Sequence, residues 1–246
     1  MTDKTATRVA LVTGASGGIG SSVVRRLAAD GYALAVHYAG NKARAQDLVE
    51  EIAAGGGSAV EVGGDVADDA AMRALFGQVE QEFGRIDVVV NTAGIMPLGP
   101  IADYDLRTFD HVMRTNVRGT FVVSQLAARH VRPGGAIINF STTVTRTLFP
   151  SYGPYVASKA AVEGMTMVLA RELRGRDITV NTVAPGPTAT ALFLDGKDEQ
   201  TVERLAHAAP LERLGRPEDI AETVAHLAGP ARWINGQTIF VNGGLA

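Results

Sequence analysis

A tyrosine and a lysine one helical turn apart are the residues of this 246-residue sequence best suited to move a proton. Tyr155 and Lys159 have i, i+4 spacing, so a helix would place both side chains on one face. A free tyrosine has a pKa of about 10, which keeps the phenol protonated at neutral pH. A neighbouring ammonium favours the phenolate and lowers that pKa. The pair therefore predicts a phenol that gives a proton to a substrate oxygen or takes one from it.

Three hydroxyl side chains precede this pair, at the end of an expected strand over residues 136–140. They belong to Ser141, Thr142 and Thr143. Successive strand residues point to opposite faces, so Ser141 and Thr142 are not expected to share one role equally. Both hydroxyls offer the same donor and acceptors, so residue chemistry alone leaves the choice between them open.

A glycine-rich turn, Thr13 to Gly20, lies between the first expected strand and the first expected helix. Glycines there permit a tight turn and let a pyrophosphate approach the backbone at the positive N-terminus of the helix. The spacing is Gly-x3-Gly-x-Gly instead of the commoner Gly-x-Gly-x2-Gly fingerprint. The turn predicts a dinucleotide site with contacts from Gly14, Ser16, Gly18, Ile19 and Gly20.

Two further segments follow expected strands at the edge where open α/β sheets bind ligands. Asp65 and Val66 follow the third strand, and the Asp65 carboxylate could meet an adenine. Asn91, Ala93 and Gly94 follow the fourth strand. Asp, Asn and Gly also suit ordinary turns, so each segment has a purely structural alternative.

Short β-branched runs alternate with helical patterns along the whole chain. We expect strands over residues 9–12, 33–38, 59–62, 86–90, 136–140, 178–183 and 238–241. We expect helices over residues 19–30, 42–54, 70–83, 109–131, 155–173 and 217–227. This order predicts an α/β, doubly wound Rossmann fold: a seven-stranded parallel sheet with helices on both faces.

No linker or repeat marks a second domain, so the sequence predicts one dinucleotide-binding and catalytic domain over residues 1–246. We expect a cofactor half over about residues 1–115 and a catalytic and substrate half over about residues 116–246. Residues 188–209, with Gly196 among charged neighbours, are expected to form a mobile lid.

Composition excludes several classes of function. The net charge of −3 argues against a nucleic-acid-binding surface. The absence of cysteine excludes disulfides and thiolate chemistry, and the five histidines have no metal-ligand spacing, so no metal site is expected. The polar start, Met1 to Arg8, and the lack of a long apolar run predict a soluble, cytoplasmic protein with a small-molecule partner and no membrane contact.

The ordered set of motifs resembles the short-chain dehydrogenase/reductase family, in particular its 3-oxoacyl-carrier-protein-reductase-like members. The resemblance rests on Thr-Gly-x3-Gly-x-Gly, Asn-x-Ala-Gly, the hydroxyl cluster, Tyr-x3-Lys and Pro-Gly, and it extends from Arg8 to Gly244. It implies an NAD(P)-dependent oxidoreductase that transfers a hydride between nicotinamide and a carbonyl or secondary alcohol.

The resemblance also implies roles for individual residues. Tyr155 would be the acid/base, and Lys159 would lower its pKa and bind the ribose hydroxyls. Asn116 would hold a water that relays protons from Lys159. A hydroxyl would steady the substrate oxygen; we favour Thr142, which falls where relatives place their serine, with Ser141 as a supporting partner.

The resemblance extends to the segment after the sixth expected strand, and the chain departs from the family pattern at two further positions. Pro185, Gly186 and Thr188 would lie beside the nicotinamide. Thr92 replaces the second Asn of Asn-Asn-Ala-Gly, which we expect to loosen a structural hydrogen bond. Gly17 stands where many NADP-using relatives have an arginine.

The segment after the second expected strand bears on the choice of cofactor. An NAD-preferring site places a carboxylate there to accept from the ribose 2′-hydroxyl. This chain has none between Tyr38 and Asp47. Tyr38 and Asn41 are expected to contact the cofactor here. A 2′-phosphate could find Asn41, Lys42 or Arg44, together with Ser16, and we expect NADP(H) to be favoured over NAD(H).

The expected helix from Val156 to Leu173 carries small or apolar residues nearly all round, which predicts burial against more than its own sheet. We expect a homo-oligomer, a tetramer by resemblance, that pairs through this helix and residues 109–131. Two alternatives stay open: a catalytically silent dinucleotide sensor of the same fold, and a sugar epimerase related to longer chains. Apolar residues near the expected site suggest a partly apolar substrate: Met96, Leu98, Leu148, Phe149, Leu192, Phe193 and Leu194.

Overall fold

The computed structural model describes residues 7–246; the first six residues of the expected polar start lie outside the described residues. Within the described residues, one parallel sheet has seven strands in the order β3-β2-β1-β4-β5-β6-β7. The strands are β1 (Val9–Thr13), β2 (Ala33–Tyr38), β3 (Ala59–Gly63), β4 (Ile86–Asn91), β5 (Val131–Phe140), β6 (Thr179–Pro185) and β7 (Thr238–Val241).

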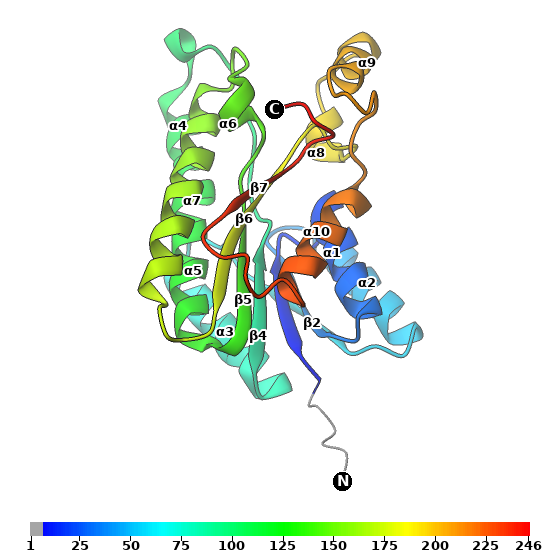
Figure 1. Ribbon diagram of the computed structural model, residues 1–246, viewed down its shortest axis with the longest axis vertical. Coiled ribbons are helices and arrows are strands. Elements are labelled where there is room, and N and C mark those ends of the chain that lie inside the picture. The colour runs from blue at the N-terminus through cyan, green and yellow to red at the C-terminus, as the bar shows by residue number, and fades with distance from the viewer. Residues whose placement is uncertain (1–6) are drawn as a thin grey trace.

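Helices cover both faces of this sheet, which confirms the predicted doubly wound fold (Figure 1). One layer contains α1 (Gly18–Ala29), α2 (Lys42–Ala54) and α10 (Pro217–Ala228). The other contains α3 (Asp69–Phe83), α5 (Gly119–His130) and α7 (Gly153–Glu172). The shorter helices are η1 (Ile101–Asp103), α4 (Leu106–Val112), η2 (Met113–Arg118), α6 (Val144–Thr147), α8 (Ala191–Leu194) and α9 (Glu199–His207).

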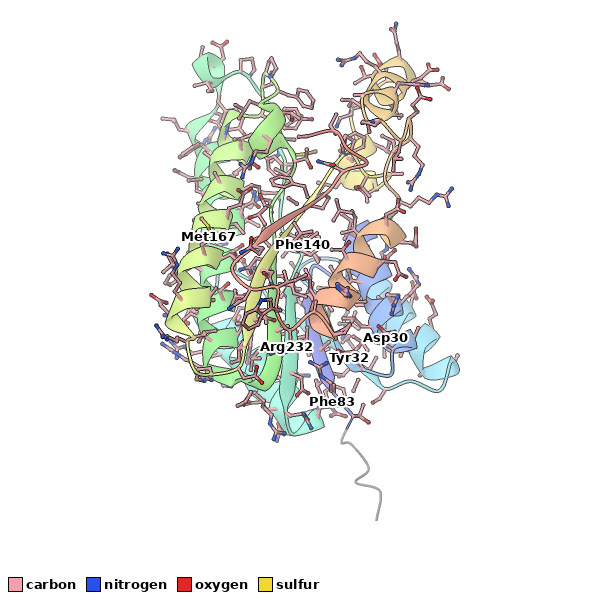
Figure 2. The ribbon with its side chains drawn as sticks, in the orientation of Figure 1. Asp30, Tyr32, Phe83, Phe140, Met167 and Arg232 are labelled. Atoms are coloured by element: carbon pink, nitrogen blue, oxygen red, sulfur yellow. The ribbon has the colours of Figure 1, made fainter. Side chains whose placement is uncertain are left out.

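The central strands are apolar on both faces because each face meets a helix layer. In β1, Ala10 and Val12 pack into the cluster that includes Val24 of α1, whereas Val9 and Leu11 join the cluster on the opposite face. Figure 2 shows Phe140 on the sheet between the two layers. The alternation of side chains along the strands thus divides one apolar sequence run between two cores.

The strand order reverses beside β1, which pairs with β2 on one side and β4 on the other. Ligands bind in such sheets at the carboxyl ends of the strands where the order reverses. Thr13 and Asn91 are register partners at these ends, and the Thr13 hydroxyl donates to Asn91 Oδ1 at 2.6 Å. This bond joins the two loops that border the crevice.

The expected helix over residues 109–131 is wrong in detail. The helical region begins at Leu106 and contains a π-helical segment, η2, between α4 and α5. It ends at His130 because Val131 already pairs with Ile86 as the first residue of β5. A π turn is wider than an α turn and is often found at functional sites.

Candidate active site

Two adjoining cavities lie at the carboxyl edge of the sheet. The catalytic cavity is lined by Tyr155, Lys159 and the hydroxyl cluster, and the glycine-loop cavity by the turn before α1 and by Asp65 and Val66. They share six wall residues: Ile19, Thr92, Gly94, Phe140, Thr190 and Leu192. The site is therefore continuous from the glycine loop to Tyr155.

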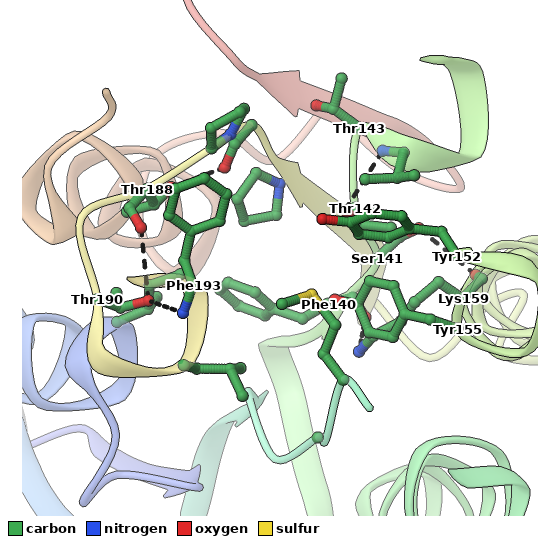
Figure 3. Close-up of a pocket in the computed structure, with 18 of the residues that line it drawn as sticks. Phe140, Ser141, Thr142, Thr143, Tyr152, Tyr155, Lys159, Thr188, Thr190 and Phe193 are labelled. Atoms are coloured by element: carbon green, nitrogen blue, oxygen red, sulfur yellow. Dashed lines mark hydrogen bonds between the residues drawn. The ribbon is translucent and has the colours of Figure 1, made fainter. Parts of the chain in front are cut away.

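Tyr155 and Lys159 are both buried on α7, as the i, i+4 spacing predicted (Figure 3). Lys159 Nζ donates to the carbonyl of Phe140 at 2.9 Å and lies 5.9 Å from the centroid of the Tyr155 ring. Burial raises the pKa of Tyr155 to about 12, opposed by a hydrogen bond with Thr142. Burial also lowers the pKa of Lys159 to about 8. The expected lowering of the tyrosine pKa is therefore not seen among the protein groups alone, because desolvation of the phenolate is the larger effect.

The two candidate hydroxyls take different partners. Ser141 Oγ donates to the buried carboxylate of Glu163 at 2.6 Å, whereas Thr142 Oγ1 accepts from the Val144 N–H at 3.3 Å. Thr142 lines the same cavity as Tyr155, and its hydroxyl lowers the pKa of the phenol. Glu163 also accepts from Thr145 Oγ1 at 2.8 Å. The carboxylate thus holds Ser141 on one side of the strand end and leaves Thr142 beside the phenol.

Asn116 lies in the π-helical segment and is fully buried. Its Oδ1 accepts from the Ile95 N–H and its Nδ2 donates to the Ile95 carbonyl, each at 2.9 Å. Nδ2 also donates to Ser158 Oγ at 3.0 Å. A Cβ on Gly94 would lie 3.3 Å from both Asn116 Oδ1 and Lys159 Nζ. The Asn116 amide and the Lys159 ammonium therefore both lie close to Gly94, whose lack of a side chain leaves room for them.

The glycine loop has the geometry of a pyrophosphate cradle. Gly14 has φ +63°, and a Cβ on Gly20 would come within 2.4 Å of the Gly14 carbonyl oxygen. α1 begins after Gly17 without a side-chain cap, and its first turn contains no acidic residue. Its first N–H groups and positive dipole are thus directed to the cavity without a competing carboxylate, and these residues fit a dinucleotide.

The His37 side chain stabilises the glycine loop through a hydrogen bond. Its ring is fully buried; Nδ1 accepts from the Gly14 N–H at 3.1 Å, and Nε2 lies 2.9 Å from the Gly64 carbonyl oxygen. Because one partner is a donor and the other an acceptor, the ring is neutral with its proton on Nε2. The sequence offered no signal for this contact, since it depends on bringing together the ends of three strands.

Asp65 and Val66 line the glycine-loop cavity, together with Ala93 and Gly94. Asp65 forms an ion pair with Arg114, which the sequence analysis did not single out. Burial pushes the pKa of Asp65 upward, but hydrogen bonds from the Ala67 N–H and Arg114 outweigh it and leave the pKa below its ordinary value. The carboxylate is thus charged and held in place.

Three predicted cofactor residues line neither cavity: Tyr38, Asn41 and Asn91. The Tyr38 ring packs over Gly63, where a Cβ would lie 2.7 Å from Cζ of the ring. Asn41 caps α2, with its Oδ1 accepting from the Arg44 N–H at 3.1 Å. Asn91 is turned toward Thr13, and its Nδ2 is buried without a partner.

Thr92 makes a hydrogen bond at the position where relatives have their second asparagine. Its hydroxyl donates to the Thr13 carbonyl at 2.6 Å. The short side chain places Oγ1 directly against the end of β1. Thr92 also lines both cavities, which the sequence analysis did not foresee.

The segment after β6 supplies the wall opposite Tyr155. Pro185, Gly186 and Thr188 line the catalytic cavity, and the Thr188 hydroxyl donates to the Gly186 carbonyl at 2.9 Å. Thr190, which the sequence analysis missed, reaches the glycine loop: a Cβ on Gly18 would lie 2.8 Å from Thr190 Cγ2. No spacing rule links these two distant positions in the chain.

Within residues 7–246, no group of three or more His, Asp or Glu side chains is arranged to hold a metal ion. The same residues contain no helix with the length and apolar character needed to cross a membrane.

The pH dependence of stability should report on His37. Burial lowers the pKa of His37 below its ordinary value of 6.5, although the Gly64 bond and Asp65 oppose this shift. A neutral ring is therefore favoured by folding, and its contribution is lost as the pH falls through the two pKa values. The melting temperature should fall from pH 7.5 to 5.5 more steeply in the wild type than in His37→Asn, whose amide can accept and donate without titrating. Equal slopes in thermal unfolding would contradict this role.

The family model described as enoyl-(acyl carrier protein) reductase matches residues 14–246 of the chain. The chain is 43% identical over 242 residues to the 3-oxoacyl-[acyl-carrier-protein] reductase FabG of Staphylococcus aureus, with 97% of this chain and 98% of the relative covered. It is 41% identical over 252 residues to the NADPH-dependent aldehyde reductase-like protein, chloroplastic, of Arabidopsis thaliana, with 96% and 93% covered.

Solved structures agree. A short chain dehydrogenase from Burkholderia cenocepacia J2315 in complex with NADP has a TM-score of 0.91 and 39% identity, with 98% of each chain covered. The match of sequence, fold and strand order extends over nearly the whole chain. The protein belongs to the short-chain dehydrogenase/reductase family, whose members are oxidoreductases that act on CH–OH groups with a nicotinamide cofactor.

Proposed function

We propose that the protein reduces an aldehyde or ketone to an alcohol with NADPH and with Tyr155 as the general acid. One observation carries the proposal. The buried phenol of Tyr155 has the Thr142 hydroxyl at its side and faces a cavity that continues into the glycine loop. Names of relatives support it, since one is an NADPH-dependent aldehyde reductase-like protein and another a 3-oxoacyl reductase.

The roles of the residues follow from their contacts. Thr142 and Tyr155 hold the substrate oxygen between two hydroxyls, and Tyr155 donates its proton as the carbonyl carbon is reduced. The bound nicotinamide supplies the hydride and, once oxidised, a positive charge that favours the phenolate. Lys159, anchored by the Phe140 carbonyl, has further donors for ribose hydroxyls and for a water held with Asn116. The same groups serve alcohol oxidation in reverse.

We propose the same division of the chain as the sequence suggested. Residues 1–115 hold the cofactor, residues 116–246 complete the catalytic site, and residues 188–209 act as a lid. The lid contains α8 and α9, and its Leu192, Phe193 and Leu205 line the catalytic cavity. A cytoplasmic location stays a prediction of the sequence.

A catalytically silent sensor is the weaker alternative. Such a protein needs the glycine-loop cavity but has no use for a buried phenol and a buried ammonium that line the adjoining cavity. Burying Tyr155 and Lys159 is unfavourable for their charged forms, and a purely structural role would not require either group.

We propose a homo-oligomer, and specifically a tetramer, that pairs through α5 and α7. Phe121 of α5 is 55% exposed, and Met167 and Val168 of α7 are 47% and 54% exposed (Figure 2). Apolar side chains gathered on a surface mark interaction sites. Light scattering at micromolar concentration should give a multiple of the 25.8 kDa chain mass. Met167→Glu combined with Val168→Glu should shift the protein toward monomer; a monomeric wild type would refute the proposal.

Tyr155→Phe tests the general acid. The variant keeps the ring but removes the proton, and general acid–base catalysis contributes roughly 10²–10⁴-fold. The kcat should fall by that order, while NADPH affinity, measured by fluorescence titration, should change little. Turnover close to that of the wild type would exclude Tyr155 as the proton donor.

The hydroxyl next to Tyr155 is tested by a matched pair. Thr142→Val deletes the hydroxyl but keeps the shape, and we expect kcat/KM to fall by about 10²-fold, as for loss of one donor to a reacting oxygen. Ser141→Ala removes the partner of Glu163 and should cost much less. A larger loss in the alanine variant would assign the role to Ser141 instead.

Cofactor preference is tested by kcat/KM with NADPH and NADH. We expect NADPH to be favoured because the two residues that line the glycine-loop cavity between β2 and α2, Ala39 and Gly40, carry no carboxylate. Ala39 lines this cavity, so Ala39→Asp should reduce the preference by placing a negative charge near a 2′-phosphate. Equal or better efficiency of the wild type with NADH would overturn the assignment.

A further inference from the structure

The catalytic cavity has apolar and aromatic walls on two opposite sides. On the α7 side, the rings of Phe149, Tyr152 and Tyr155 form an edge-to-face series, with centroids 6.1 Å and 6.4 Å apart. Figure 3 shows Phe193 of the lid across the cavity from Tyr152 and Tyr155. Such rings pack favourably against another aromatic ring, beyond the effect of area buried. The walls thus match a flat, apolar group held between the lid and α7.

Charge is scarce in this cavity. Among the described residues that line it, Lys159 is the only one with a side chain that is charged at neutral pH. Its Nζ donates to the Phe140 carbonyl at 2.9 Å. The cavity therefore has no free cation to receive a carboxylate or phosphate, and an unpaired ion pays a large desolvation penalty.

The lid adds a negative field at the mouth. Residues 188–209 contain four acidic residues and two basic ones, a net charge of −2 with His207 neutral. Of the two basic residues, Lys197 is already engaged: its Nζ lies 4.6 Å from the centroid of the Phe193 ring and donates to the Phe193 carbonyl. Acyl groups carried on phosphate-bearing thioesters meet like charge when they approach this lid.

We propose that the substrate class is an uncharged aryl aldehyde or aryl ketone, with its ring between Phe193 and the Phe149–Tyr152 pair. This inference rests on the proposed carbonyl reduction and names its substrate. The relatives are named for two activities, aldehyde reduction and 3-oxoacyl reduction. The proposal favours the first, because the cavity suits a free, neutral carbonyl compound and disfavours an anionic acyl thioester.

The test uses matched compounds with the wild-type enzyme and NADPH: methyl 4-formylbenzoate, 4-formylbenzoate and acetoacetyl-CoA. We expect kcat/KM for the ester to exceed that for the carboxylate by about 100-fold, and acetoacetyl-CoA to be the poorer substrate by a similar factor. An ester-to-carboxylate ratio below tenfold, or acetoacetyl-CoA as the better substrate, would overturn the proposal.

Binding separates this inference from the proposed function. Dissociation constants for the same two benzoates are measured with the NADPH complex of Tyr155→Phe, where the proton donor is absent. A similar preference for the ester supports the substrate class even if the wild type reduces neither compound, a result that would refute the proposed function alone. Methyl 4-formylcyclohexanecarboxylate is the saturated control; if it binds as tightly as the aromatic ester, the aromatic part of the proposal is wrong.

A charge-introducing variant completes the test. Leu192 lines the cavity from the lid and is 54% exposed. Leu192→Lys places an ammonium at this wall, and we expect the ratio of kcat/KM for 4-formylbenzoate to kcat/KM for the ester to rise at least tenfold, whatever the change in either value alone. No rise in this ratio would show that charge does not govern selection and would count against the proposal.

Discussion

The buried pair of Tyr155 and Lys159 is the constraint on which the rest of the site depends. A phenol and an ammonium held out of water need partners at fixed distances, and the structure supplies them from neighbouring elements. The end of β5 provides the Phe140 carbonyl for Lys159, and the segment that follows it places Thr142 in the same cavity as Tyr155. The position of α7 against β5 is therefore set by chemistry as well as by apolar packing.

Contacts between neighbouring elements also fix the geometry of the first half of the chain. The glycine loop is closely packed between Thr92 on one side and His37 behind it, and the bond from Thr13 to Asn91 fixes the two strand ends on either side of the crevice. Thr190, from the second half of the chain, also packs against the glycine loop. These contacts thus determine the shape of the glycine loop.

Much of this arrangement could be predicted from the sequence, because it follows from local rules. Apolar runs predicted the strands, the glycine spacing predicted the loop, and the i, i+4 pair predicted the shared face of α7. Contacts between distant segments could not be predicted. The π-helical segment around Asn116, the His37 bridge and the Ser141–Glu163 bond depend on which elements become neighbours. Chain position predicts cofactor contacts for Tyr38 and Asn41. In the structure, however, the Tyr38 ring packs over Gly63 and the Asn41 side chain caps α2.

We propose that the positive charge of the bound cofactor decides whether Tyr155 ionises. Burial raises the pKa of Tyr155 to about 12 despite the opposing effect of Thr142, which is too high for easy ionisation. We propose that the positive nicotinamide of bound NADP⁺ would lower this pKa. The most direct measurement is the ultraviolet difference spectrum of tyrosinate, wild type minus Tyr155→Phe, recorded against pH with and without NADP⁺. We predict no ionisation of Tyr155 up to pH 9 without NADP⁺ and a tyrosinate signal below that pH when NADP⁺ is bound. Ionisation that is unaffected by NADP⁺ would contradict the account.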